Sequence, residues 1–204
     1  MKASLALGIL LVLATAGYAD APPAAAPAVA PPDVQAVAAV RELGGNVMPV
    51  AQNDPRLDVT LHLADKEVKD EHLATVAKLT PVVWLNLAGT KITDAGLAHL
   101  KGMVTLERLH LERTAITDAG LDSIVGLTNL EYLNLYGTAI TDAGLQKLAA
   151  LKKLKKLYLW QTKTTPEGVA ALKQALPELK ANTGAEMTPK PPATPAPAAE
   201  PEKK

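Results

Sequence analysis

The sequence of 204 residues contains no cysteine, no phenylalanine and only two serines, Ser4 and Ser123. The chain therefore has no disulfide and no thiol nucleophile, and Ser123 is its one serine beyond the first few residues. An excess of charge is also lacking, because 21 basic and 21 acidic residues give a formal net charge of +0. No overall field attracts a polyanion, so we expect no nucleic-acid partner.

The N-terminus has the pattern of a secretory signal peptide. Lys2 precedes an apolar run over residues 5–14, and small residues follow. The run is shorter than the roughly 20 apolar residues of a membrane-spanning helix. We predict a signal peptide over residues 1–19, with cleavage after Ala21 as the alternative, and no stable membrane insertion after cleavage. The expected location is periplasmic, cell-surface or secreted. A retained N-terminal anchor is the competing interpretation.

Two segments rich in proline and alanine, residues 20–32 and 185–204, flank the rest of the chain. They offer little apolar surface to offset the entropy of ordering them, so we predict a linker and a disordered tail. A spacer role is the simpler interpretation of the tail. A cell-wall-spanning arm or a proline-rich docking peptide is the alternative.

Between these segments the chain repeats itself every 24 residues. Clean copies start at Val82, at Leu106 (LERLHLERTAITDAGL) and at Leu130 (LEYLNLYGTAITDAGL), and a fourth starts at Leu154. A degraded first copy, DVTLHLADKEVKDEHL, starts at Asp58. In the same 24-residue alignment its apolar positions are Leu61, Leu63, Val68 and Leu73. Its Thr60, His62 and Ala64 then match Trp84, Asn86 and Ala88.

Each copy combines two periodicities. Alternation such as Leu109-His110-Leu111 predicts a strand with one buried side. The following Thr-Asp-Ala-Gly-Leu predicts a helix, in which the threonine is the N-cap and the aspartate suits the positive end of the helix dipole. In the fourth copy Pro166 and Glu167 replace Asp-Ala and favour the same helix start. Apolar pairs such as Leu121 and Ile124 then face the strands.

The pattern LxxLxLxxTxITDAGLxxLxxL resembles leucine-rich repeats of the ribonuclease-inhibitor-like and F-box-associated type, with threonine where that family usually has asparagine. The resemblance runs from Asp58 to about Leu179 and suggests a secreted bacterial-type member. It implies an α/β fold, a right-handed β/α solenoid with parallel strands on its concave face and helices outside. It also implies binding rather than chemistry.

Caps are predicted at both ends of the solenoid, because an uncapped repeat array exposes its core. We assign residues 33–57 to an N-terminal cap, with Asp33 as the N-cap of an apolar-striped helix that Gly44 and Gly45 end. A short strand is expected near residues 47–50. The repeat domain then covers residues 58–184, and its last helix ends before Pro177.

Side chains between the strand leucines point away from the helices, on the concave face. Every aromatic residue after the signal peptide is among them. Because exposed Trp, Tyr and Arg dominate binding hot spots, we predict that this face binds a partner. The candidate residues are Trp84, Arg108, His110, Glu112, Tyr132, Asn134, Tyr136, Lys156, Tyr158 and Trp160. The alternative is that the aromatics only pair across strands, with Arg108 and Lys156 as cation–π support.

No metal or cofactor is expected. His62 and His110 belong to strands two apart and converge poorly on one ion. A calcium ladder of Asp94, Asp118 and Asp142 is disfavoured, because first-turn electrostatics explains an aspartate in each helix and Pro166 interrupts the series. The threonines at the turns after the strands are expected to bond backbone carbonyls. They are Thr90, Thr114, Thr138 and Thr162.

The charges are unevenly distributed: lysines gather around the last clean repeat, and acidic residues lie in the first. This is either a solvated surface or, with Lys156 beside Tyr158 and Trp160, a site for an acidic protein patch or an anionic glycan. No nucleophile with an adjacent base is found, so we expect that the protein is not an enzyme. We predict an exported monomer that binds a protein partner. The alternatives are an envelope carbohydrate-binding module and a passive structural spacer.

Overall fold

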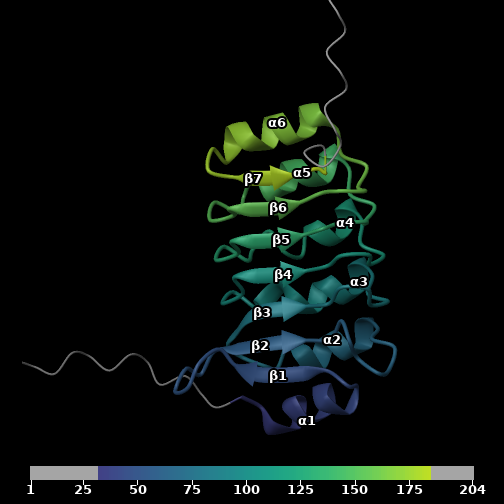
Figure 1. The fold of residues 1–204 in the computed structure, drawn as a ribbon, viewed down its shortest axis with the longest axis vertical. Coiled ribbons are helices and arrows are strands. Elements are labelled where there is room, and N and C mark those ends of the chain that lie inside the picture. Colours follow the sequence, from purple (N-terminus) through teal and green to yellow (C-terminus); the bar gives the residue numbers. More distant parts are fainter. Residues whose placement is uncertain (1–31, 185–204) are drawn as a thin grey trace, which may run out of the picture.

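The computed structural model describes residues 32–184. The predicted signal peptide, most of the linker and the tail lie outside the described residues. Seven strands form one sheet in chain order, and the helices form a second layer along it (Figure 1). Only β1 is antiparallel to its neighbour. The strands are β1 Asn46–Pro49, β2 Leu57–Thr60, β3 Val82–Asn86, β4 Arg108–His110, β5 Tyr132–Asn134, β6 Lys156–Tyr158 and β7 Lys180–Asn182.

The helices alternate with the strands, and most are short. They are α1 Val34–Glu42, α2 Asp70–Val76, α3 Asp94–Leu97 with the 3-10 helix η1 Ala98–Gly102, α4 Asp118–Leu121, α5 Asp142–Leu148 and α6 Pro166–Ala175. Asp33 caps α1 by accepting two backbone N–H groups, as predicted. Ile124 lies beyond α4, in turns closed by i to i−3 hydrogen bonds, although its side chain is buried as expected. This arrangement confirms the α/β leucine-rich-repeat solenoid.

The predicted alignment of the first repeat is wrong on its strand. Val59 lies opposite Leu85, and Leu61 takes the backbone position of Leu87. Leu61 is therefore 1% exposed and Leu63 76% exposed. The turn between β2 and α2 holds two more residues than the later turns. The error has a physical cause, because the alternation around Leu61 fits the pleat equally well after a shift of two residues.

The core is aliphatic throughout the described residues. Leucine, isoleucine and valine from strands and helices form one continuous cluster, completed by Ala36 and Met103, and no aromatic side chain belongs to it. The turn threonines lie at its edge. Thr90, Thr114, Thr138 and Thr162 each donate a hydroxyl hydrogen bond of 2.6–2.7 Å to the leucine carbonyl three residues earlier. Their predicted role is confirmed.

A second ladder joins neighbouring repeats through the Thr-Asp-Ala-Gly segment. Asp94 accepts the backbone N–H of Thr117 at 2.8 Å and its hydroxyl at 2.6 Å. The Thr117 hydroxyl in turn accepts the Ala119 N–H, which caps α4. The same contacts occur in the pairs Asp70–Thr93, Asp94–Thr117, Asp118–Thr141 and Asp142–Thr165. Each aspartate thus bonds the next repeat as well as serving its own helix.

The glycine of the same segment makes room for this aspartate. A Cβ atom on Gly120 would overlap the carboxylate of Asp94, and Gly96, Gly144 and Gly168 stand in the same relation to the preceding aspartate. The threonine, aspartate and glycine of the segment are therefore explained by helix formation and by the contact between repeats. No group of three or more metal-ligating side chains is found within residues 32–184.

Candidate binding face

The side of the sheet away from the helices, the concave face, carries all ten predicted residues. Strand register aligns its side chains in rows across the repeats. One row runs through Met48, Asp58, Trp84, Arg108, Tyr132, Lys156 and Lys180. A second runs through Asn46, Thr60, Asn86, His110, Asn134, Tyr158 and Asn182. Glu112, Tyr136 and Trp160 follow two residues after the second row.

Four rings on this face form a first aromatic track. Trp84, His110, Tyr132 and Tyr158 follow one another with ring centroids 6.0, 4.7 and 5.3 Å apart and interplanar angles of 30–40°. All four are half-buried. Burial raises the pKa of Tyr132. A hydrogen bond from the Asn134 side chain acts in the opposite direction but is the smaller effect. The rings support one another across the strands, as the packing interpretation of the aromatics predicted.

A second aromatic track lies beside the first and contains the exposed Trp160 next to the half-buried Tyr136. Tyr136 stacks on Trp160 with centroids 5.3 Å apart and an angle of 26°, and Trp160 is 47% exposed. The guanidinium of Arg113 lies 5.1 Å from the centre of the Tyr136 ring and donates to its hydroxyl at 3.0 Å. At the far end, Gly184 fits beneath the indole of Trp160, where a Cβ atom would collide.

Arg113 occupies a backbone position that favours glycine. Its φ of 53° is left-handed, and the matching residues of the neighbouring repeats are Gly89 and Gly137, at 70° and 69°. A non-glycine residue in this region costs of order 1 kcal/mol. Arg113 was not among the predicted residues, because it falls outside the alternating positions that were assigned to the concave face. The cation–π contact found in the described residues is this one, whereas Arg108 and Lys156 are exposed.

A polar cluster lies between the two tracks. Glu112 Oε1 accepts from His110 Nδ1 at 2.7 Å and also from the side-chain amide of Asn134. Because a carboxylate only accepts, the His110 proton sits on Nδ1. The second oxygen, Glu112 Oε2, and the indole N–H of Trp84 are buried and have no hydrogen-bond partner among the described residues. The cluster thus leaves one acceptor and one donor at this face unpaired.

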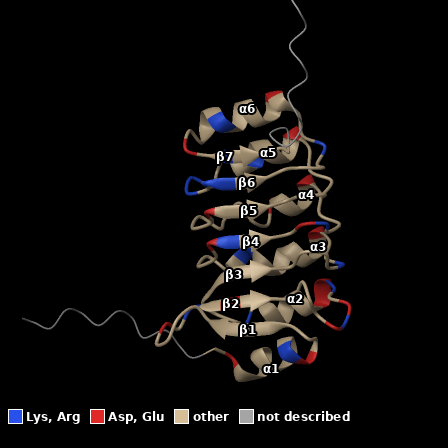
Figure 2. Cartoon of the chain, in the orientation of Figure 1, with Lys and Arg blue, Asp and Glu red and all other residues tan. Residues whose placement is uncertain are grey.

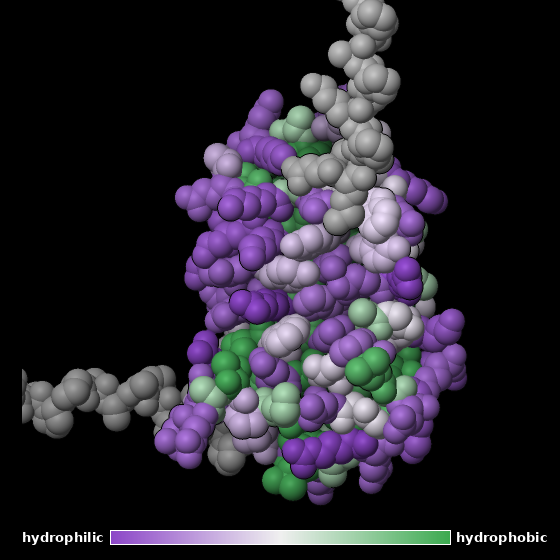
Figure 3. Space-filling model, viewed as in Figure 1, coloured by the Kyte–Doolittle hydropathy of each residue, from purple (hydrophilic) through white to green (hydrophobic). Residues whose placement is uncertain are grey.

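The N-terminal part of the face differs from the prediction because of the shifted first repeat. Asp58 rather than Thr60 lies opposite Trp84, and Met48 lies opposite Asp58. Burial raises the pKa of Asp58, while the charge of Arg108 acts in the other direction. Met48 is 52% exposed, and hydrophobic residues show mainly around β1–β3 in Figure 3. Asp58 and Met48 would have been predicted on the concave face if β1 had been paired antiparallel to β2 and β2 had been set in its correct register.

Two further features bear on the kind of site. Ser123 is buried in the turn just after α4, so it belongs to the helical layer and not to the concave face. None of the helices within residues 32–184 is long and apolar enough to cross a membrane.

The chain was compared with known proteins. A family model described as leucine rich repeat matches residues 80–140 and 104–163. A search of curated proteins finds no match. Among solved structures, internalin C2 of Listeria monocytogenes is similar, with 31% identity over 53% of this chain and 44% of that one and a TM-score of 0.46. Internalin F of the same organism has 21% identity over 57% and 32% of the two chains and a TM-score of 0.48.

A leucine-rich-repeat protein of Leptospira interrogans has 22% identity over 53% of this chain and 33% of that one, with a TM-score of 0.39. This chain spans less than half the length of each of these three proteins. Leucine-rich repeats are in general protein-interaction modules. With a family model that matches residues 80–163 and a repeat that continues on both sides, this chain is a leucine-rich-repeat protein.

Proposed function

We propose that this chain is an exported interaction module that binds a protein partner through the concave face. The observation that supports this best is the distribution of aromatic residues. All five in the described part of the chain lie on the concave face, and the core contains none. Aliphatic side chains fill the interior, and Trp160 has 47% of its surface exposed to solvent. Exposed tryptophan and tyrosine at the centre of a patch are typical of binding hot spots.

The two aromatic tracks have different parts in this proposal. The first track is half-buried and its rings pack against one another, so it stabilises the sheet. The second track offers the partner the exposed indole of Trp160 and the Tyr136 ring.

The size of the face sets the size of the partner's epitope. Seven strands at a spacing of about 4.8 Å give a strip about 29 Å long. This is the extent of a small, local epitope. A carbohydrate ligand is the second candidate, because Trp160 is 47% exposed and a sugar can pack against an exposed aromatic ring.

The test compares the wild-type chain with Trp160→Ala and Tyr136→Ala. Proteins of a cell-envelope extract are captured on the immobilised wild-type chain, and the affinity of each purified candidate is then measured. We expect saturable binding that weakens at least tenfold in both variants, because hot-spot truncations typically cost about 2 kcal/mol or more. A glycan array is probed with the same three proteins. Lys101→Ala, on η1 of the helical layer, is the matched control.

Melting temperatures separate binding from stability. Trp160 is largely exposed, so Trp160→Ala should change the melting temperature little, whereas Tyr132→Ala removes a ring packed on both sides and should lower it. Sugar binding without protein binding would favour the carbohydrate candidate. If no wild-type signal exceeds that of the variants, the proposed function is wrong and a passive spacer remains.

A further inference from the structure

The C-terminal end of the sheet is an open strand edge. The backbone N–H of Lys180 donates to Lys155 and the carbonyl of Asn182 accepts from Leu159, so both residues bond toward β6. Alternation along the strand then turns the N–H and C=O of Ala181 to the other edge. No strand in the described part of the chain pairs there. Such an edge is a template for a further strand.

A groove follows this edge along the whole of β7. It consists of two adjoining hollows of about 360 and 530 Å³, which share Lys173 of α6 and Ala181 of β7. The first hollow opens beside Lys156 and Tyr158 of the concave face. The second is lined by the start of α6, including Pro166 and Val169. The groove therefore has one polar, basic wall and one largely apolar wall.

The basic wall carries charge that the described residues do not neutralise. Lys156, Lys173 and Lys180 take part in no ion pair within residues 32–184. The surroundings are basic as well, with eight lysines against only Glu167 and Glu178 between residues 143 and 184. Basic residues mark β6 and α6 in Figure 2, while acidic ones gather at the start of α2.

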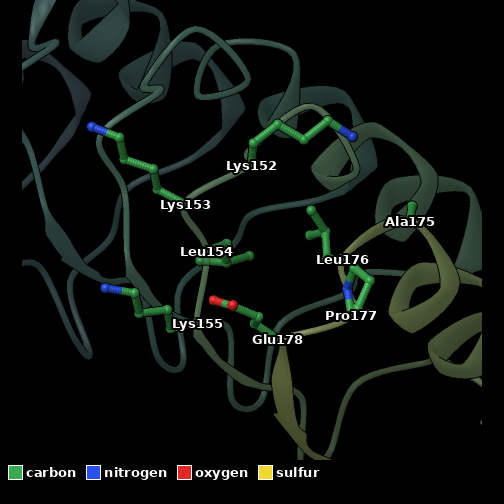
Figure 4. Close-up of a pocket in the computed structure, with 8 residues that line it drawn as sticks. All are labelled: Lys152, Lys153, Leu154, Lys155, Ala175, Leu176, Pro177 and Glu178. Carbon is green, nitrogen blue, oxygen red and sulfur yellow. The ribbon is translucent and has the colours of Figure 1, made fainter.

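A neighbouring basic hollow shows the contrast. It is lined by Lys152, Lys153, Lys155 and Glu178 and lies where β6 begins (Figure 4). There the amine of Lys153 donates to Asn129 at 2.7 Å, and the amine of Lys155 pairs with Glu131 at 3.0 Å. Two of its three lysines are therefore already engaged. The groove along β7 differs because it combines unpaired lysines with an open strand edge.

We propose that this groove binds an acidic, extended segment of a partner protein, which adds a strand to β7. Its backbone pairs with Ala181. Its acidic side chains lie beside Lys156 and Lys180, and the alternate, small apolar side chains face the end of the core beside Ala181 and Val169. The open N–H and C=O groups favour a peptide over an anionic glycan, which has no strand backbone to pair with them. The inference deepens the proposed function and rests on it, since Lys156 and Tyr158 belong to the concave face.

The probe is a fluorescein-labelled octapeptide of alternating glutamate and valine, titrated with the full chain by fluorescence anisotropy. The triple variant Lys156→Gln, Lys173→Gln, Lys180→Gln removes the basic wall. Lys78→Gln, Lys91→Gln, Lys101→Gln makes the same change of net charge at lysines that do not line or adjoin the groove. The same peptide methylated on alternate backbone nitrogens keeps its charges but cannot pair as a strand. We expect the groove variant and the methylated peptide each to weaken binding about tenfold, and the control variant to bind like the wild type.

Equal binding of the methylated and unmethylated peptides would overturn strand addition, and equal loss in both lysine variants would overturn the site. Tighter binding of tetragalacturonate than of the peptide would overturn the assignment to a peptide. Trp160→Ala separates this inference from the proposed function. If envelope partners depend on Trp160 but not on the groove lysines, the inference fails and the function stands. If the probe needs the lysines and no partner needs Trp160, the concave-face function fails.

Discussion

At the scale of single residues, the Thr-Asp-Ala-Gly segment shows how closely one repeat fits the next. The threonine starts its own helix and also donates its hydroxyl to the aspartate of the preceding repeat. The glycine leaves the space that this aspartate fills. The sequence alone predicted the N-cap, since capping is a local pattern. The bond to the preceding repeat joins residues 23 apart, and only the stacking of repeats brings them together.

Replacing Gly144 tests this fit. Gly144→Ala places a Cβ atom against the Asp118 carboxylate and the Leu121 side chain, so we expect a loss of about 1–3 kcal/mol of unfolding free energy from overpacking. Gly126→Ala is the control, because its Cβ atom would meet no atom within 4 Å. Urea denaturation of both variants measures the difference. Equal stability of the two would show that the aspartate moves aside freely.

Asp142 gives the ladder a dependence on pH. The N–H and hydroxyl of Thr165 lower the pKa of its carboxyl below the ordinary 3.8. A lowered pKa means that the charged form stabilises the fold above the ordinary pKa and that this contribution disappears as the pH falls through the folded value. We therefore expect Asp142→Asn to be less stable than the wild type at pH 7, with a difference that closes in acid.

The difference is measured by urea denaturation of the wild type and of Asp142→Asn at a series of pH values between about pH 7 and pH 2. The comparison with the variant isolates Asp142 from the other carboxylates that titrate in the same range. A difference independent of pH would show that the bonds to Thr165 do not need the charge.

At the scale of elements, the first strand of the repeat domain shows the limit of the sequence pattern. The later copies could be aligned because Leu, Thr, Asp and Gly recur together in each of them. The first copy has two additional residues in its turn, and its alternating residues fit either register. For the same reason Asp58 and Met48 were not predicted on the concave face. Arg113 was missed because it falls outside the alternation of buried and exposed positions.

The register makes a direct prediction. Leu61→Ala should cost about 2–5 kcal/mol, because it removes a fully buried side chain. Leu63→Ala should cost less than about 0.5 kcal/mol, because its side chain is exposed. Denaturant titration of the two variants measures this. Similar losses of unfolding free energy in the two variants would contradict the observed register and support the 24-residue alignment of the first strand.

At the scale of the whole molecule, stability should vary along the stack. Each inner repeat is bonded on two sides, while α1 and β7 each have neighbours on one side only. Repeat arrays lose structure from their ends, so we expect amide hydrogens of α1 and β7 to exchange fastest and those of β4 and β5 slowest. Hydrogen exchange followed by mass spectrometry measures the gradient. Uniform protection would mean that the domain opens only as one unit.

The inter-repeat ladder also bears on how such a chain can grow. Each of the three copies that contain Thr-Asp-Ala-Gly carries the aspartate that bonds forward and the threonine and glycine that receive the preceding one, so both halves of the joint lie within one 24-residue copy. A copy duplicated in frame would meet a matching partner on either side without any compensating change. The length of the concave face is thereby open to variation by whole repeats, each adding about 4.8 Å of sheet.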